Sequence, residues 1–261
     1  MKIVRTIAEV PHESGSVGLV PTMGAFHAGH VALFAAARAE NDVVLASLFV
    51  NPAQFGAGED LDRYPRDEER DAKLAEDAGV DVLFAPSAAE MYPEGYATWV
   101  DVGELGEKLE GEFRPGHFPG VATVCLKLFN IVRPDRAYFG QKDAQQAAVV
   151  KQLVRDLNLD LEIRVVPTVR DKDGLALSSR NAYLSGEERK KALALPNALW
   201  TGRDAFLTGS DPVKEARRCL HSLDVDYLDV ADLDGQKVLA AAVRIGKTRL
   251  IDNVILEGEE T

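Results

Sequence analysis

Short apolar runs recur along this chain, and segments with helical spacing separate them. The runs cover residues 17–20, 43–50, 80–85, 136–139 and 161–166. The run 43–50 is apolar almost throughout, as expected of a strand buried on both faces, and it stops at Asn51-Pro52. The alternation predicts an α/β fold in which helices cover a parallel sheet. In such sheets ligands bind at the carboxyl ends of the strands.

The pattern changes after Pro167. Ser185 with Glu188 and then Asp211-Pro212 are typical helix starts, and strand-like stretches follow at 225–231, 238–243 and 248–255. At 261 residues the chain is long enough for a larger and a smaller domain. We predict a larger parallel-sheet domain over residues 1–168 and a smaller α+β domain over 169–261.

Charge and cysteine content narrow the class of protein. The formal net charge is −12, which argues against a nucleic-acid partner, because such binding depends on Lys and Arg. Cys125 and Cys219 form no paired motif and read as free thiols. Residues 1–5 lack the apolar core of a signal peptide, and no apolar run reaches membrane-spanning length. We therefore expect a cytoplasmic protein with no membrane segment.

A glycine-flanked pair of histidines follows the first buried run. His27 and His30 are three residues apart, so both side chains lie on one face of the first helical turn. Unpaired backbone N–H groups at a helix start attract anions, which favours phosphate as the ligand. A purely structural role is the competing interpretation. A zinc site is disfavoured, because the chain offers few candidates for a third ligand.

A second set of polar residues lies further along. Lys142 follows the run 136–139 and opens a helix, so its ammonium can reach the crevice at the carboxyl end of that strand. The alternative is a solvated surface lysine. Ser178, Ser179 and Arg180 supply hydroxyl and guanidinium donors suited to a pyrophosphate, although such a tripeptide is common.

Amides and carboxylates complete the candidate set. Gln54, Gln146 and Arg114 could orient a small hydroxy acid, or could be ordinary surface residues. One carboxylate of the acidic stretch 67–71 could help to hold Mg²⁺, although a solvated helix face is the usual reading of such a stretch.

Taken together, these segments resemble the pantoate:β-alanine ligase (pantothenate synthetase) family. The resemblance is close over about residues 18–185 and looser in the rest. It rests on ordered matches at 21–24 with His27 and His30, 49–52 with 54–55, 64–66, 114–118, 134–140, 142–143 with 145–146, and 178–181.

The resemblance implies a Rossmann-like nucleotidyltransferase domain that binds ATP and pantoate, followed by a C-terminal lid domain, in a homodimer. The implied reaction is the ATP-dependent condensation of pantoate with β-alanine to pantothenate. It passes through a pantoyl adenylate and releases AMP and pyrophosphate. Mg²⁺ accompanies ATP, and no covalent enzyme intermediate is needed.

By position, the resemblance assigns roles to individual residues. It implies catalytic roles for His27, His30, Lys142 and Arg180, a metal role for Asp71, and substrate contacts for Asn51, Gln54, Arg114 and Gln146. The ATP site would comprise Met23, His27, His30, Gly140, Lys142, Asp143, Val169, Leu177, Ser178, Ser179 and Arg180.

Two residues depart from the family pattern. Ala144 stands where an aromatic residue is usual, and Leu177 replaces the usual Met before Ser-Ser-Arg. Neither change removes a charged group. The competing interpretations are an adenylyltransferase acting on pantetheine phosphate or nicotinamide mononucleotide, and a nucleotide-binding regulator without catalysis. Glutamines in place of extra cations disfavour the first, and Lys142 with Arg180 disfavours the second.

Overall fold

The structure, a computed structural model, describes residues 1–12 and 14–257. The chain forms two compact units. One comprises Met1–Phe139 and Val149–Val166, and the other comprises Gly140–Ala148 and the chain from Pro167 onward.

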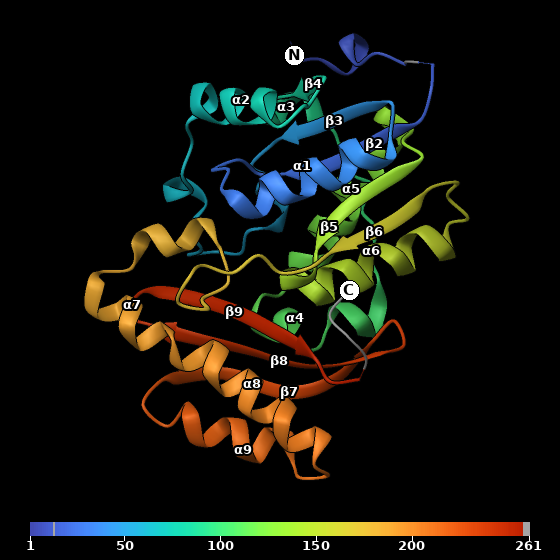
Figure 1. The fold of residues 1–261 in the computed structure, drawn as a ribbon. Helices are drawn as coiled ribbons and strands as arrows, with labels where there is room; N and C mark the ends of the chain where they lie inside the picture. The colour runs from blue at the N-terminus through green and yellow to red at the C-terminus, as the bar shows by residue number, and fades with distance from the viewer. Residues whose placement is uncertain (13, 258–261) are drawn as a thin grey trace. The chain divides into compact units, whose positions relative to one another are not determined.

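The first unit is built on a six-stranded sheet. Its strands are β1 (Lys2–Val4), β2 (Val17–Thr22), β3 (Val43–Leu48), β4 (Val82–Phe84), β5 (Arg136–Gly140) and β6 (Glu162–Val166). Their order is β1-β4-β3-β2-β5-β6, and the pairs β1–β4, β4–β3, β3–β2 and β2–β5 are parallel (Figure 1). The predicted parallel α/β fold is confirmed. Strand β1 was not predicted. Only one of its three residues, Val4, is buried, so the strand leaves no apolar run in the sequence.

The chain order reverses between β2 and β5. From β2 the sheet continues through β3 and β4 on one side and through β5 and β6 on the other. The carboxyl ends of β2 and β5 therefore flank a topological switch point, which is where open sheets of this class bind ligands.

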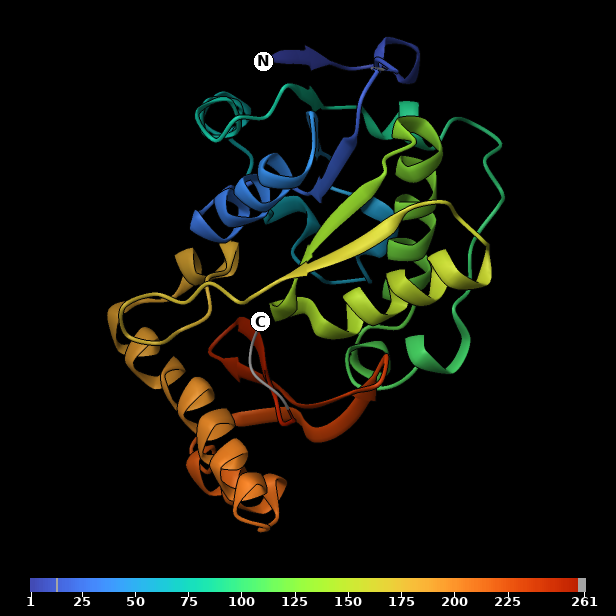
Figure 2. The same cartoon turned by 45° about the vertical axis from the view of Figure 1, so that its right-hand side comes forward.

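Helices cover both faces of this sheet. The helices in this part of the chain are α1 (Ala28–Glu40), α2 (Glu68–Asp77), α3 (Ala88–Met91), α4 (Glu110–Phe113), α5 (His117–Val132) and α6 (Ala144–Asp156). Helices α1 and α2 bury Phe34, Ala37 and Ala75 with Val20 and Leu83 of the sheet. Helix α5 lies on the opposite face from α1 (Figure 2). It is apolar and buried along most of its length, because it packs on a sheet whose strands are buried on both sides.

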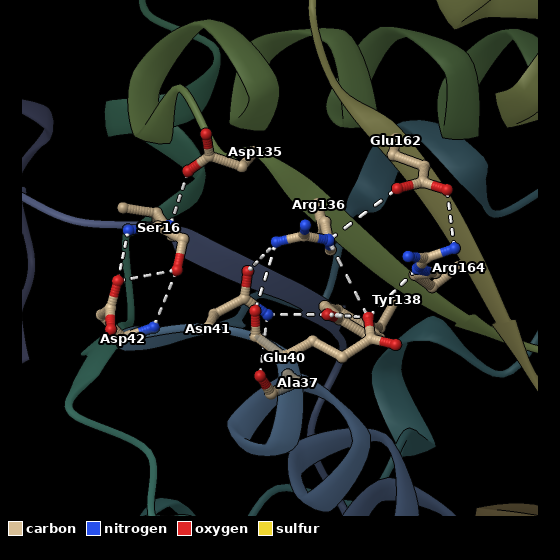
Figure 3. A network of polar contacts seen from close by, with 11 residues as sticks. Ser16, Ala37, Glu40, Asn41, Asp42, Asp135, Arg136, Tyr138, Glu162 and Arg164 are labelled. Atoms are coloured by element: carbon tan, nitrogen blue, oxygen red, sulfur yellow. Dashed lines mark hydrogen bonds and ion pairs between the residues drawn. The ribbon is translucent and has the colours of Figure 1, made fainter.

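A polar network ties together the amino ends of the strands (Figure 3). Asn41 Nδ2 donates to the Tyr138 hydroxyl at 2.6 Å, and that hydroxyl donates to Glu40 at 2.8 Å. Arg136 donates to Asn41 Oδ1 at 3.2 Å, and Arg164 donates to Glu40 at 3.0 Å. The end of α1 is thereby fixed to the starts of β5 and β6.

The second unit contains an antiparallel sheet. Strands β7 (Asp224–Leu233), β8 (Gln236–Ile245) and β9 (Thr248–Ile255) pair in chain order. Helices α7 (Gly186–Ala192), α8 (Ala194–Leu207) and α9 (Pro212–Cys219) accompany them, and α8 packs along β8 and β9 (Figure 1). The core includes Leu195, Leu199, Leu239 and Val254. The capping box of Ser185 with Glu188 and the Asp211 cap confirm the predicted helix starts.

Residues 140–148 pack with the second unit although the sequence analysis assigned them to the first domain. They do so because the backbone carbonyls of Gln141 and Lys142 accept hydrogen bonds from Asn253 on β9. The division of the chain at 168/169 into a substrate-binding domain and a lid domain stays a prediction. Over residues 1–12 and 14–257, no helix is long and apolar enough to cross a membrane.

We predict that Gly18→Ala destabilises the first unit. A Cβ at Gly18 would lie 2.6 Å from Asn41 Nδ2 and 3.2 Å from Tyr138 Cε2, so the network at the amino ends must shift. We expect the free energy of unfolding to fall by about 1–3 kcal/mol in urea titrations. Gly56→Ala is the matched control, since its Cβ would meet only Glu59 at 3.7 Å or beyond. An equal effect of the two substitutions would contradict this account.

Candidate active site

The two histidines close the first turn of α1 with their own rings. His27 Nδ1 accepts from the Gly29 N–H at 3.1 Å, and His30 Nδ1 accepts from the His27 N–H at 3.2 Å. The ring centroids are 4.2 Å apart, so the histidines lie together as predicted. The expectation of unpaired backbone N–H groups was wrong for Gly29 and His27, whose N–H groups bond to the rings. Because each Nδ1 is an acceptor, each ring carries its hydrogen on Nε2 and presents an N–H donor there.

The turn between β2 and α1 has an unusual backbone. Gly24 has φ of 91° and Ala25 has φ of 53°, a region that side chains disfavour. A Cβ on Gly24 would lie 2.7 Å from Leu48 Cδ1 and 3.0 Å from Asp71 Oδ2. The turn therefore needs glycine at this position and an external partner to stabilise it.

Asp71 on α2 is that partner. Its carboxylate accepts the Ala25 N–H at 2.7 Å and the Phe26 N–H at 2.8 Å, and its side chain is 1% exposed. Burial raises the pKa of the Asp71 carboxyl, and the two N–H donors oppose that shift. Among residues 1–12 and 14–257, no group of three or more His, Cys, Asp or Glu side chains is arranged to hold a metal ion. The contacts indicate that Asp71 braces the turn, and its role as a magnesium ligand stays a prediction.

Three predicted residues meet after β2 and β3. Asn51 Nδ2 donates to Gln54 Oε1 at 3.0 Å and to the Gly120 carbonyl at 3.1 Å, and Gln54 Nε2 donates to Met23 Sδ at 3.2 Å. Asn51 and Gln54 are both buried. The turn Pro52–Gln54 presses against α5 so closely that a Cβ on Gly120 would lie 2.3 Å from the Ala53 carbonyl oxygen. The first unit therefore brings Met23, Asn51 and Gln54 together.

Arg114 lies beside this cluster but faces protein groups. Its guanidinium donates twice to Glu59 at 2.8 Å, and it lies 3.1 Å from His117 Nε2. His117 Nδ1 in turn lies 2.9 Å from the Gln54 carbonyl oxygen. These contacts indicate that Arg114 holds the Gln54 segment in place. Direct substrate contact by Arg114 stays a prediction.

His117 is neutral in this setting. Burial, reinforced by the charge of Arg114, lowers the pKa of its ring from 6.5 to about 4. Because Arg114 can only donate, His117 Nε2 accepts, and the Nδ1 hydrogen is donated to the Gln54 carbonyl. The ring therefore bridges the Arg114 guanidinium and the backbone carbonyl of Gln54.

The remaining predicted residues belong to the second unit. Gly140 precedes the turn Gln141–Asp143, in which Lys142 Nζ lies 3.3 Å from Asp143 Oδ1, and the turn leads directly into α6. Ala144, in place of the family's aromatic residue, is buried, whereas Gln146 is half-buried.

Val169 and Leu177 are paired across a short hairpin. The Leu177 N–H donates to the Val169 carbonyl at 3.0 Å, and an isolated bridge joins Arg170 to Ala176. Ser178 follows and caps the turn Ser179–Tyr183, accepting from the Arg180 N–H at 3.3 Å. The hairpin thus places Leu177, Ser178, Ser179 and Arg180 in one short segment of this unit.

Sequence reasoning missed several residues that support the predicted ones. Tyr92 donates to Asn51 Oδ1 at 2.9 Å, and burial raises the pKa of its hydroxyl, so it remains a donor. Glu59 fixes Arg114. The sequence gives little indication of either residue, because both lie in irregular segments and no periodicity links them to their partners.

Comparisons with known proteins show which proteins this chain is similar to. The family described as pantoate-beta-alanine ligase matches residues 1–255. The pantothenate synthetase of Moorella thermoacetica is 53% identical, with 98% of this chain and 99% of that protein covered. The crystal structure of pantothenate synthetase from Thermus thermophilus superposes with a TM-score of 0.95 at 48% identity, covering 99% of this chain and 100% of that one. The pantoate-beta-alanine ligase of Francisella tularensis, crystallised in complex with beta-gamma ATP and beta-alanine, gives a TM-score of 0.86 at 36% identity, with 100% of both chains covered.

We predict that Asp71→Asn destabilises the protein, because an amide presents N–H groups to one of the two backbone donors. The expected loss in free energy of unfolding is about 1–3 kcal/mol, measured by urea unfolding at pH 7. Asp77→Asn is the control, because this carboxylate is exposed at the end of the same helix and pairs with Lys73 at the surface. A loss no larger than that of Asp77→Asn would refute the bracing role.

We also predict that His117 makes a pH-dependent contribution to the free energy of unfolding. The unfolded chain takes up this proton near pH 6.5 and the folded chain only near pH 4. The stabilisation is therefore complete above pH 6.5 and is lost as the pH falls toward 4. The difference in unfolding free energy between wild type and His117→Asn should be largest at about pH 7.5 and shrink toward pH 4. A constant difference for His117→Asn across this pH range would contradict the assignment.

Proposed function

Because the chain belongs to the pantoate-beta-alanine ligase family, matched over residues 1–255, we propose that it condenses pantoate with β-alanine to pantothenate at the expense of ATP. The main support is the similarity to a pantothenate synthetase at 53% identity over 98% of this chain. The contact between Asn51 and Gln54 and the pairing of His27 with His30 add to it. The Francisella tularensis relative in complex with beta-gamma ATP and beta-alanine supports both as substrates.

The first step joins the pantoate carboxylate to AMP. A carboxylate oxygen attacks the α-phosphorus, a P–O bond forms, and the bond to pyrophosphate breaks with its electron pair leaving on pyrophosphate. Both reactants are anionic, so the site must supply positive charge and oriented N–H donors where charge accumulates. The Nε2–H groups of His27 and His30, the Lys142 ammonium and the Arg180 guanidinium are of that kind. Their action on one nucleotide is part of the proposal.

Pantoate recognition is assigned to the amides. Gln54 is buried and oriented by Asn51, and Gln146 lies in the first turns of α6. An amide both donates and accepts, which suits a hydroxyl group next to a carboxylate. Neither residue adds charge, so the site does not favour a second phosphate on the acceptor.

The second step forms the amide bond. The β-alanine amine attacks the acyl carbon of pantoyl adenylate and a C–N bond forms. The C–O bond to AMP breaks with its electron pair leaving on AMP, and the nitrogen gives up a proton to solvent. Carboxylate activation has already been supplied by ATP, so no enzyme nucleophile is required. Water competes for the adenylate, which gives exclusion of solvent a chemical purpose.

Mg²⁺ enters the proposal as the counter-ion of the ATP phosphates, the type of ligand it favours. Within residues 1–12 and 14–257, no group of three or more His, Cys, Asp or Glu side chains could hold the ion by itself, and both oxygens of Asp71 accept backbone N–H groups. We propose a homodimer and a cytoplasmic location as well. The family resemblance supports the dimer, and the free thiols Cys125 and Cys219 suit a reducing compartment.

The direct test is mass spectrometry of products formed from ATP, Mg²⁺, pantoate and β-alanine. Pantothenate, AMP and pyrophosphate should appear together. With β-alanine omitted, pantoyl adenylate and pyrophosphate should form. ADP with phosphate as the products, or turnover independent of pantoate, would refute the proposal.

We predict that Lys142→Ala and His30→Ala lose pantoate-dependent pyrophosphate release by about two to three orders of magnitude, because each removes a donor aimed at developing charge. Both variants should stay folded by circular dichroism. The controls are Lys190→Ala, whose ammonium pairs with Glu187 at the surface, and His221→Ala on an exposed ring. Folded Lys142 or His30 variants that keep normal release would exclude these roles.

A further inference from the structure

We propose that Asn253, near the carboxyl end of β9, is a positioning residue for Lys142. Its side-chain N–H groups donate to the carbonyls of Gln141 and Lys142, each at 2.9 Å. Its Oδ1 accepts from Gln141 Nε2 at 3.0 Å. One amide thus fixes the turn that carries the lysine from 111 residues further along the chain. The inference rests on the proposed function, in which Lys142 serves ATP.

The bonding of this amide is specific. Asn253 is 3% exposed, and both its donor and its acceptor functions are used by the turn. Rotating the amide by half a turn would set oxygen against two carbonyl oxygens. A buried amide with this pattern holds one backbone geometry, because any other leaves buried polar groups unsatisfied.

The neighbouring residue extends the arrangement to the hairpin. Asp252, 2% exposed, binds the Arg170 guanidinium with two hydrogen bonds of 2.6 and 3.0 Å. Arg170 follows Val169 and also donates to the Gly174 carbonyl at 3.2 Å. Burial raises the pKa of the Asp252 carboxyl, and the charges of Arg170 and Lys142 oppose the rise. Two successive residues of β9 therefore hold both the Lys142 turn and the hairpin that leads to Ser178.

This link has a mechanistic purpose. Donors that act on a transition state must be held in place before the reaction, and a displacement of about 1 Å can cost roughly a hundredfold in rate. Lys142 lies in a short turn, which has little rigidity of its own. Asn253 and Asp252 supply that rigidity and set the lysine turn and the serine–arginine segment in a fixed relation within the second unit.

The test separates positioning from general stability by following the two half-reactions. We expect Asn253→Ala to lower the single-turnover rate of pyrophosphate release from ATP and pantoate by at least about tenfold per folded enzyme. Conversion of supplied pantoyl adenylate and β-alanine to pantothenate should stay within about twofold of wild type, because Lys142 acts on the triphosphate. Asn253→Asp keeps the acceptor for Gln141 and loses both donors, so it should behave as Asn253→Ala.

Asn41→Ala is the stability-matched control. Asn41 is likewise buried, and its amide bonds to Ala37 and Tyr138 at the amino ends of the strands. It should lower the melting temperature comparably and leave both half-reactions unchanged per folded enzyme. Should Asn253→Ala fail to fold, Gln141→Ala removes only the third bond and should slow the first half-reaction by about threefold.

The outcomes distinguish the two proposals. A wild-type enzyme that releases no pyrophosphate with pantoate overturns the proposed function and this inference with it. A wild-type enzyme that does so, with Asn253 and Gln141 variants equal to it or slowed equally in both half-reactions, overturns only the positioning role.

Discussion

Two turns that follow parallel strands depend on one buried side chain each. A turn that leaves a sheet gives up the ladder of backbone hydrogen bonds, so its N–H and C=O groups need other partners. After β2, Asp71 accepts the N–H groups of Ala25 and Phe26. After β5, Asn253 donates to the carbonyls of Gln141 and Lys142. The chemistry of each partner matches the turn: an acceptor meets exposed donors, and a donor meets exposed acceptors.

The fold could be predicted from sequence because burial leaves a repeated trace. The runs at 17–20, 43–50, 136–139 and 161–166 became β2, β3, β5 and β6, and the caps at Ser185 and Asp211 start α7 and α9. Strand β1 escaped, because a three-residue edge strand has too few buried positions to show a period. The histidines were found from their spacing, and a structural role was weighed for them. The backbone N–H groups that their rings accept could not be predicted, since they depend on ring orientation.

The supporting residues could not be predicted, because a side chain's distant partner leaves no local pattern. Asp71 stands in an acidic stretch in which only its burial marks it out. A solvated helix face was the usual reading of that stretch, with Mg²⁺ binding by one carboxylate as the alternative. Arg114 was recognised, but Glu59, which pairs with it, lies 55 residues away in an irregular segment. Asp252 and Asn253 interrupt an apolar strand, and that interruption is the single visible sign of their role.

The assignment of residues 140–148 to the second unit means that neither unit is one continuous stretch of chain. The polypeptide passes from one to the other after Phe139, after Ala148 and after Val166. A fragment ending near residue 168 would carry the lysine turn without the strand that holds it, and the complementary fragment would lack the lysine. During synthesis, the turn emerges long before its asparagine partner, so its final geometry is set only when the last strand of the small sheet is in place.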